Sequence, residues 1–261
     1  MEWFAVGAYG LASAVFLLLV ARGGKGSPAE TRLATAARLA LVGAFVVHAG
    51  DIGLRCVHGI HPFAGVGEVF SLASWLLAGG YLALTLRHRL SVVGSLVAPA
   101  SLVLLLLARV APSATGDVRL GVLGRVHVSL ATAGVVAFGL AAAVAVFYLV
   151  QESRLKQRRP VTSRGPALQT LDEINRRCVT LGFPVFTVAL VIGAVWIPQV
   201  GARLRPEHSF ALASWIAFAA LVVARLTVGW RGRRAAWLTL VGFSSALIVL
   251  VMYAVRSRLG G

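Results

Sequence analysis

Acidic residues are scarce in this chain. Nine Asp and Glu residues stand against 25 Lys and Arg residues, so the formal net charge is +16, yet charged residues make up only 13% of the 261 positions. The hydrophobic content of 58% is far above that of soluble globular domains. The composition therefore predicts an integral membrane protein, in which the positive charge reports topology rather than nucleic-acid binding.

Several kinds of reactive site are also missing from the sequence. There is no Ser/His/Asp set, no glycine-rich phosphate loop and no pair of carboxylates inside an apolar run, which argues against a hydrolase, a nucleotide-binding protein and a proton pump. The two cysteines, Cys56 and Cys178, form no CxxC pair and are expected at opposite faces of the membrane. We therefore expect no disulfide between them.

Eight apolar runs are long enough to cross a hydrocarbon core of roughly 30 Å. They cover residues 3–21, 33–49, 69–86, 92–110, 126–150, 179–198, 210–224 and 235–255. We predict an all-α, polytopic membrane helix bundle of eight transmembrane helices in a single domain, residues 1–261. The first run has neither a basic leading segment nor a small-residue cleavage site, so we expect it to be retained rather than cleaved as a secretory signal.

The basic residues decide the expected orientation. With the N-terminus outside, 17 of the 25 Lys and Arg residues fall in cytoplasmic segments, in agreement with the excess of basic residues in cytoplasmic loops. Both termini are then expected outside. The longest cytoplasmic segment is the linker 152–177, whose charge, Pro and Gly content separates four spans from the next four.

A short sequence recurs in the two halves. Residues 70–75 read FSLASW and residues 210–215 read FALASW, in the third and seventh spans, which run in the same direction. Equal direction indicates a 4+4 parallel repeat about an axis along the membrane normal. Chance recurrence of Ala, Leu and Ser in apolar helices is the alternative.

Five of the six histidines are expected at the outer face. His48 and His127 lie at similar depth near the outer ends of spans two and five. Two such imidazoles with apolar surroundings suit the axial ligands of heme b, although a histidine hydrogen-bonded to a neighbouring helix is the alternative for each. Weaker metal-ligand candidates are His58, His61 and His208, and His88 is expected in a cytoplasmic turn.

A haem also needs cations for its propionates and flat apolar surfaces beside its ring. The outer-face cations proposed for the propionates are Arg55, Arg125 and Arg205, with Arg119 and Arg203 nearby in the sequence. The proposed haem walls are Trp75, Trp196 and Trp215. Asp51 and Glu68 are candidates to orient an imidazole, and solvated loop charge is the alternative role for both.

The segment that begins at His127 carries several motifs in a fixed order. HVSLATAGVVAFGLAAAVAVFYLVQESRLK is followed by LDEINRRCVTLGFPVFTVALVIGAVW and, at residues 229–243, by GWRGRRAAWLTLVGF. In these segments the chain resembles the cytochrome c assembly (CcsA/ResC) membrane family and is especially similar to its short HemX/YpjD branch. The resemblance implies a bacterial cytoplasmic (inner) membrane protein of cytochrome c biogenesis, with His127 at the position of an outer haem-ligating histidine.

Three features typical of that family are missing. After GAVW the family continues with WGxxWxWDPKE, whereas this chain reads IPQVGARLRPEHSF; the histidine of the following helix falls on Val223, and the outer histidine after the last helix is absent. The resemblance therefore implies a factor that binds or positions haem for cytochrome c assembly rather than a complete synthetase. The partners implied are haem, other assembly components, apocytochrome c and the lipid bilayer, with no nucleic acid.

Two alternatives stay open. The first is a haem-free membrane scaffold or regulator of haem-pathway or assembly proteins, suggested by the missing Trp-rich signature. The second is a small-solute transporter built on the repeat, which is less favoured because no span carries a charge near its middle.

Overall fold

The computed structural model describes residues 2–22, 27–88, 90–111, 121–157, 166–199 and 205–259. Within these ranges every regular element is an α-helix. The helices are α1 (Glu2–Ala21), α2 (Pro28–Val57), α3 (Val66–Thr85), α4 (Ser91–Val110), α5 (Val122–Lys156), α6 (Leu168–Gln199), α7 (Pro206–Thr227) and α8 (Arg233–Leu259). All eight are long and apolar enough to cross a membrane. The prediction of an all-α polytopic bundle is confirmed, and the chain is a multi-pass membrane protein.

Several helices are longer than the apolar runs that predicted them. α2 has 30 residues, α5 has 35 and α6 has 32. Of the expected linker 152–177, residues 152–156 end α5 and residues 168–177 begin α6, while residues 158–165 lie outside the described residues. Polar helix ends beyond the hydrocarbon core are stabilised by ion pairs at helical spacing, such as Lys156–Glu152 at 2.8 Å and Arg177–Glu173 at 2.7 Å.

Local sequence explains where individual helices begin. The Ser27 side chain accepts a hydrogen bond from the Glu30 backbone N–H, and Pro28 occupies the first turn of α2, where its missing N–H costs nothing. α7 begins in a similar way with Pro206 after Arg205. These caps fix the connections that lead into α2 and α7.

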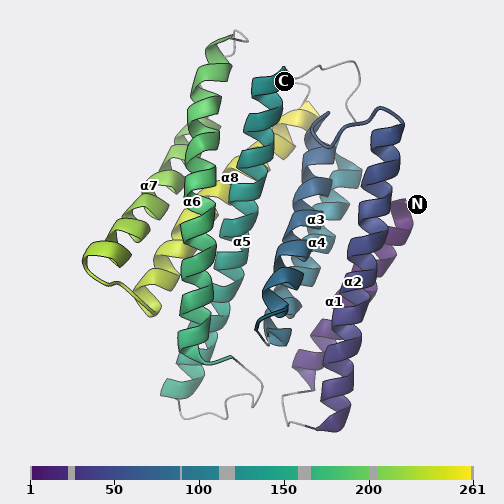
Figure 1. The fold of residues 1–261 in the computed structure, drawn as a ribbon, viewed down its shortest axis with the longest axis vertical. Helices are drawn as coiled ribbons and strands as arrows, with labels where there is room; N and C mark the ends of the chain where they lie inside the picture. Colours follow the sequence, from purple (N-terminus) through teal and green to yellow (C-terminus); the bar gives the residue numbers. More distant parts are fainter. Residues whose placement is uncertain are drawn as a thin grey trace.

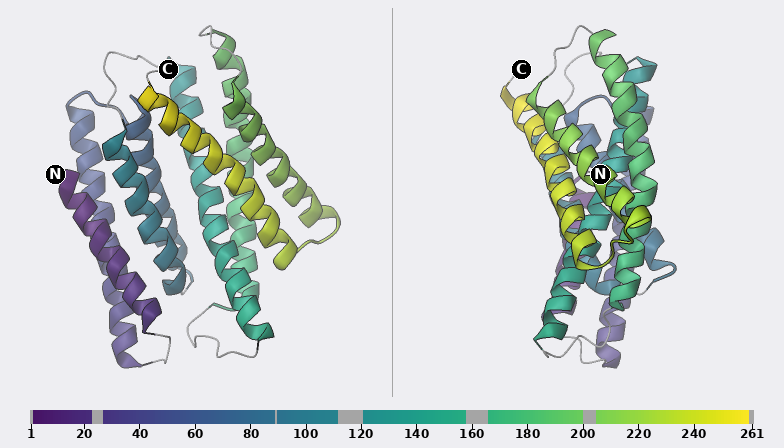
Figure 2. Two further views of the ribbon diagram at one scale, coloured as in Figure 1. Left: turned by 180° about the vertical axis from the view of Figure 1, so that it is seen from behind. Right: turned by 90° about the vertical axis from the view of Figure 1, so that its left-hand side faces the viewer.

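The helices form two groups of four, α1 to α4 and α5 to α8, which lie side by side (Figures 1 and 2). In each group the first helix packs on the second and the fourth, and the third also packs on the second and the fourth. The groups meet mainly where α3 and α4 contact α5. The α2–α3 connection, the end of α6 and the start of α7 lie at one end of the bundle, called the upper end because Figure 1 draws it uppermost. The start of α1 and the end of α8 point the same way.

The two tryptophans of the repeated hexapeptide make matching contacts. Trp75 stacks on Phe45 of α2 with ring centroids 4.8 Å apart, and Trp215 stacks on Phe183 of α6 at 5.8 Å. The Trp75 indole N–H donates to the Phe45 carbonyl, whereas the Trp215 N–H donates to the Thr187 hydroxyl. Since the third helix of each group contacts the second in the same manner, these contacts agree with the predicted repeat.

The serines beside those tryptophans repeat as well. Ser74 donates to the Ser101 carbonyl of α4 at 2.7 Å, and Ser214 donates to the Gly242 carbonyl of α8 at 2.8 Å. Both serines are fully buried. Each hydroxyl therefore ties the third helix of its group to the fourth, where a lone hydroxyl in an apolar core would otherwise lack a partner.

Candidate functional site

His127 lies in the second turn of α5, half-buried against α6 at the upper end. Its Nδ1 is 2.7 Å from the carbonyl oxygen of Ala189. Because a carbonyl only accepts, the imidazole proton is on Nδ1, and Nε2 has no hydrogen-bond partner among the described residues. An imidazole held by a carbonyl through one nitrogen, with the other nitrogen free, is the arrangement found in metal-ligating histidines.

Gly193 allows the imidazole to lie close against α6. A β-carbon at this position would be 2.6 Å from Cε1 and 2.8 Å from Nδ1 of His127. Trp196 follows three residues later, with its ring centroid 5.9 Å from that of His127 and the planes tilted by 31°. His127, Ala189, Gly193 and Trp196 therefore form one unit, referred to below as the His127 site.

His48 has a different environment, inside the first group of helices. It is fully buried. Its Nε2 is 2.9 Å from the Ser71 hydroxyl of α3, and its Nδ1 is 3.3 Å from the Tyr9 hydroxyl of α1. Both ring nitrogens are thus engaged, and His48 would ligate a metal only after giving up one of these partners.

The two histidines predicted as a ligand pair, His48 and His127, have separate surroundings in the structure. The partners of His48 lie on α1 and α3, whereas those of His127 lie on α6. Their helices, α2 and α5, share no substantial packing interface in the part of the chain that the structure describes. Shared ligation of one iron by His48 and His127 stays a prediction that needs a different arrangement.

The remaining histidines take local roles. His58 is the exposed capping residue that follows α2, and its Nδ1 lies 2.7 Å from the Leu54 carbonyl oxygen. His61 is exposed in the following connection, and His208 accepts from the Arg205 backbone N–H at 2.8 Å, which caps α7. Over the described ranges, no three His, Cys, Asp or Glu side chains group so as to hold a metal ion.

The predicted propionate partners are scattered. Arg125 is exposed two residues before His127, and Arg205 is exposed at the start of α7. Arg55 instead pairs with Asp51 at 3.3 Å and lies 4.0 Å from Glu68. Arg119 and Arg203 lie outside the described residues. Only Arg125 is close in sequence to the candidate ligand.

The three tryptophans predicted to line a haem also lie in different places. Trp75 and Trp215 are packed within their own halves against α2 and α6. Trp196 alone contacts a candidate histidine. The structure therefore brings together His127 and Trp196 from the predicted set.

Asp51 and Glu68 are not solvated loop charges, so that alternative prediction was wrong. Asp51 belongs to α2 and is 3% exposed, and Glu68 belongs to α3 and is 9% exposed. Arg109 of α4 reaches Asp51 at 3.2 Å. The error arose because the apolar run in span two stops at residue 49, whereas the helix continues to Val57 and carries its ionic residues into the bundle.

A second polar cluster, missed from sequence, joins the last four helices at the lower end. Arg225 of α7 contacts Asp172 at 3.2 Å and the Asn175 side-chain oxygen at 2.8 Å, and Asp172 also accepts from the Gly232 backbone N–H. Asn175 donates to the Ala141 carbonyl of α5. Asp172 and Asn175 belong to the LDEINRR motif and Gly232 to the GWRGRR motif. The available signal was the spacing of Asp172 and Asn175, which places them on one face of α6. The cluster therefore has a structural role: it holds α6 to its neighbouring helices.

The similarity of this chain to known proteins covers more residues than these motifs. A family model described as Cytochrome C assembly protein matches residues 66–260. The cytochrome c biogenesis protein CcsA of Synechococcus elongatus is 40% identical over 94 residues, covering 35% of this chain and 28% of that protein. CcsA of Gloeobacter violaceus is 41% identical over 88 residues, covering 33% and 26%. The matched segment thus spans between 26% and 28% of the length of these relatives. No solved structure matches this chain.

Proposed function

The chain belongs to the cytochrome c assembly protein family, and from that premise we propose that it binds haem at the upper end of the bundle, as cargo for cytochrome c assembly. The observation that carries the proposal is the state of His127, whose Nδ1–H is held by the Ala189 carbonyl while Nε2 is left without a partner. A neutral imidazole with a free nitrogen is the form that ligates iron.

The surroundings of His127 fit a porphyrin. Trp196 presents an aromatic surface beside the imidazole, and Val126 and Val195 are exposed apolar residues next to His127 and Trp196 in the sequence. Arg125 supplies an exposed cation for a propionate. In this proposal His127 is the axial ligand, Ala189 and Gly193 orient its ring, and Trp196 lies against the macrocycle.

Haem is the cargo, and the covalent step of attachment is not assigned to this chain. The proposed role is to hold haem at a bacterial cytoplasmic membrane until an apocytochrome or another assembly component takes it. The upper end is then the outer face, as the distribution of basic residues predicts. Ligation by His48 would require its Nε2 to exchange Ser71 for iron, so we assign the first ligand to His127 alone.

The test is a titration of the detergent-purified protein with haem, followed by the Soret absorbance. We expect His127→Ala to weaken binding by at least about tenfold. His208→Ala is the matched control, since His208 is also an upper-end histidine but caps α7 through Arg205. Equal binding by wild type and His127→Ala would refute the site. No binding by the wild type would favour the haem-free scaffold or regulator instead.

A further inference from the structure

The connection between α7 and α8 carries an exposed basic patch that the proposed haem site does not use. Residues 230–234 read WRGRR, and the side chains of Arg231, Arg233 and Arg234 are all exposed. This segment, called the basic turn below, lies at the outer edge of the second group of helices, away from the first group (Figures 1 and 2). Its three arginines are therefore open to the surroundings of the bundle.

Two glycines shape the backbone at the basic turn. Gly229 and Gly232 have φ angles of 68° and 65°, a conformation that glycine adopts without strain. The Gly232 N–H donates to Oδ1 of Asp172 on α6 at 3.1 Å. A β-carbon on Gly232 would lie 2.6 Å from the hydroxyl oxygen of Tyr148 on α5. The start of α8 is thus held against α5 and α6, and the arginines project from a fixed backbone.

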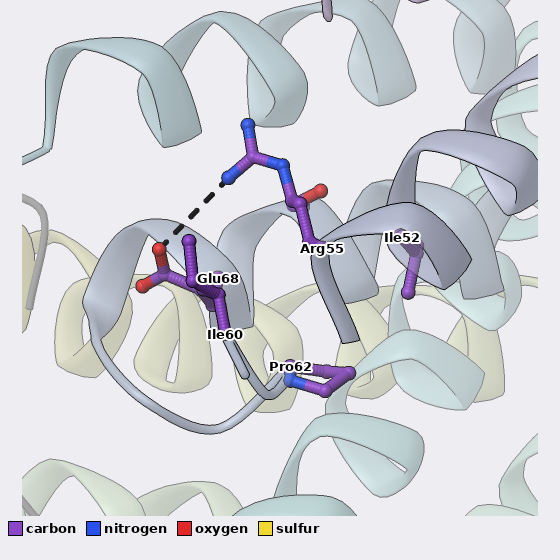
Figure 3. Close-up of a pocket in the computed structure, with 6 residues that line it drawn as sticks. Ile52, Arg55, Ile60, Pro62 and Glu68 are labelled. Atoms are coloured by element: carbon purple, nitrogen blue, oxygen red, sulfur yellow. Dashed lines mark ion pairs between the residues drawn. The ribbon is translucent and has the colours of Figure 1, made fainter. Parts of the chain in front are cut away.

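The three arginines of the basic turn form no ion pair with any carboxylate of the described residues. At the upper end, by contrast, Arg55 lies 4.0 Å from Glu68, which it faces in Figure 3. The carboxylates near the basic turn are engaged by other cations: Asp172 by Arg225, Glu173 by Arg176 and Arg177, and Glu152 by Lys156. The positive charge of the basic turn is therefore not neutralised within the described part of the chain.

The start of α8 adds to this positive charge. The first turn of α8 contains no acidic residue, whereas Glu30, Glu68 and Glu207 stand in the first turns of α2, α3 and α7. The first N–H groups of a helix carry partial positive charge and bind anions, above all phosphate. The basic turn therefore places three guanidinium groups around a helix end that itself favours an anion.

Arg225 is an independent sign that an anion is favoured here. Its side chain is 7% exposed. Its Nη2 contacts the same oxygen of Asp172 that accepts from the Gly232 N–H, so the guanidinium lies directly behind the start of α8. Nε and Nη1 of Arg225 are buried and have no acceptor, which is costly for a buried donor. A negative charge at the basic turn would offset part of this cost by electrostatic attraction.

Exposed apolar side chains beside the basic turn indicate that the anion belongs to a lipid. Leu226 and Val228 are 81% and 71% exposed, and Trp237 on α8 is 53% exposed. The guanidinium carbon of Arg234 lies 6.0 Å from the ring centroid of Trp230. Tryptophan and arginine side chains at helix ends are typical of the membrane–water interface, where lipid phosphates lie. A soluble anion would leave these apolar surfaces unused.

We propose that the basic turn binds the headgroup of an anionic phospholipid. The phosphate contacts Arg233 and Arg234 at the start of α8, Arg231 adds to the local charge, and the acyl chains lie along Leu226 and Trp237. A zwitterionic lipid is disfavoured, because its ammonium group would enter a patch of three arginines without a carboxylate. Since both leaflets contain phosphates at the level of helix ends, the proposal depends neither on the orientation of the chain nor on haem binding.

Native mass spectrometry of the full-length, detergent-purified protein tests the choice of lipid. The protein is mixed with equal amounts of phosphatidylglycerol, phosphatidylethanolamine and phosphatidylcholine that carry the same acyl chains. We expect phosphatidylglycerol to be retained at least about tenfold more than phosphatidylcholine. Equal retention of the three lipids would overturn the proposal, and this comparison needs no variant. Displacement of phosphatidylglycerol by glycerophosphoglycerol or by a polyglutamate peptide at equal concentration would refute the lipid as the occupant.

Paired variants locate the site. Arg233→Gln combined with Arg234→Gln should weaken phosphatidylglycerol binding by about 10- to 30-fold, because two cations near the headgroup are lost. The matched control combines Arg176→Gln with Arg177→Gln, which removes two exposed arginines from the same end of the second group, where Glu173 holds them. We expect this control to bind nearly as well as the wild type. Equal losses in the two double variants would show that the lipid responds to overall charge and would refute the basic turn as the site.

Discussion

Gly193→Ala tests whether the orientation of His127 matters for haem binding. The new β-carbon would lie 2.6 Å from Cε1 and 2.8 Å from Nδ1 of His127, closer than real β-carbons approach other atoms. The obstructing atoms belong to the end of a side chain, so the imidazole rotates away while the helices stay packed. The rotation breaks the 2.7 Å hydrogen bond to Ala189.

The expected loss follows from that hydrogen bond. A neutral hydrogen bond contributes about 1 kcal/mol, and removal of a group that orients a metal-ligating histidine typically costs about 10- to 100-fold in metal affinity. We therefore expect the haem Kd of Gly193→Ala to rise by about 10- to 100-fold, with little change in Tm. Haem titration by Soret absorbance measures the first quantity, and a thermal unfolding assay on the same sample measures the second.

Two controls separate orientation from general damage. Gly43→Ala on α2 adds the same methyl group where nothing lies within 4 Å, so its haem Kd should equal that of the wild type. Adding Gly193→Ala to His127→Ala should cause no further loss, because the two changes act on one ligand. Normal haem affinity in Gly193→Ala would refute the positioning role of Gly193, and an additional loss in the double variant would show that Gly193 acts elsewhere.

Three further predictions concern the fold and its orientation. Asp172→Asn should lower the free energy of unfolding by roughly 3 kcal/mol, because it leaves the 7%-exposed Arg225 side chain without its ion partner. Thermal unfolding in detergent measures this change, and a loss below about 1 kcal/mol would contradict the structural role of the cluster. Ser74→Ala and Ser214→Ala should each cost about 1 kcal/mol, measured in the same way, and a large inequality would argue against equivalent roles in the repeat. In a background of Cys56→Ser and Cys178→Ser, His61→Cys should react with a membrane-impermeant thiol reagent added outside cells and Arg231→Cys should not; the reverse pattern would invert the topology.

Apolar run length and repeated sequence predicted much of the fold. The eight spans emerged from hydropathy because a helix that crosses lipid must keep an apolar surface over its whole hydrocarbon length. The hexapeptide pair anticipated the matching contacts of Trp75 and Trp215. Helix ends were misjudged at α2, where a polar end continues past the apolar run and buries Asp51.

The site itself could be predicted only in part. His127 was singled out by its depth and its motif, but its contact with Ala189 and Gly193 depends on the rotation of α5 against α6, which residue spacing within one helix does not specify. His48 has the same predicted depth, yet its ring is enclosed by Tyr9 and Ser71 from two other helices. Depth along a helix and neighbours across helices are separate quantities, and hydropathy reports only the first.

The most direct test of the account replaces the His127 side chain and then supplies its chemistry from solution. His127→Gly should lose the Soret band of the haem-loaded protein, and free imidazole should restore it by entering the space that the side chain left. His48→Gly should keep the band without imidazole. A wild-type Soret band in His127→Gly before imidazole is added would contradict the claim that His127 is the haem ligand.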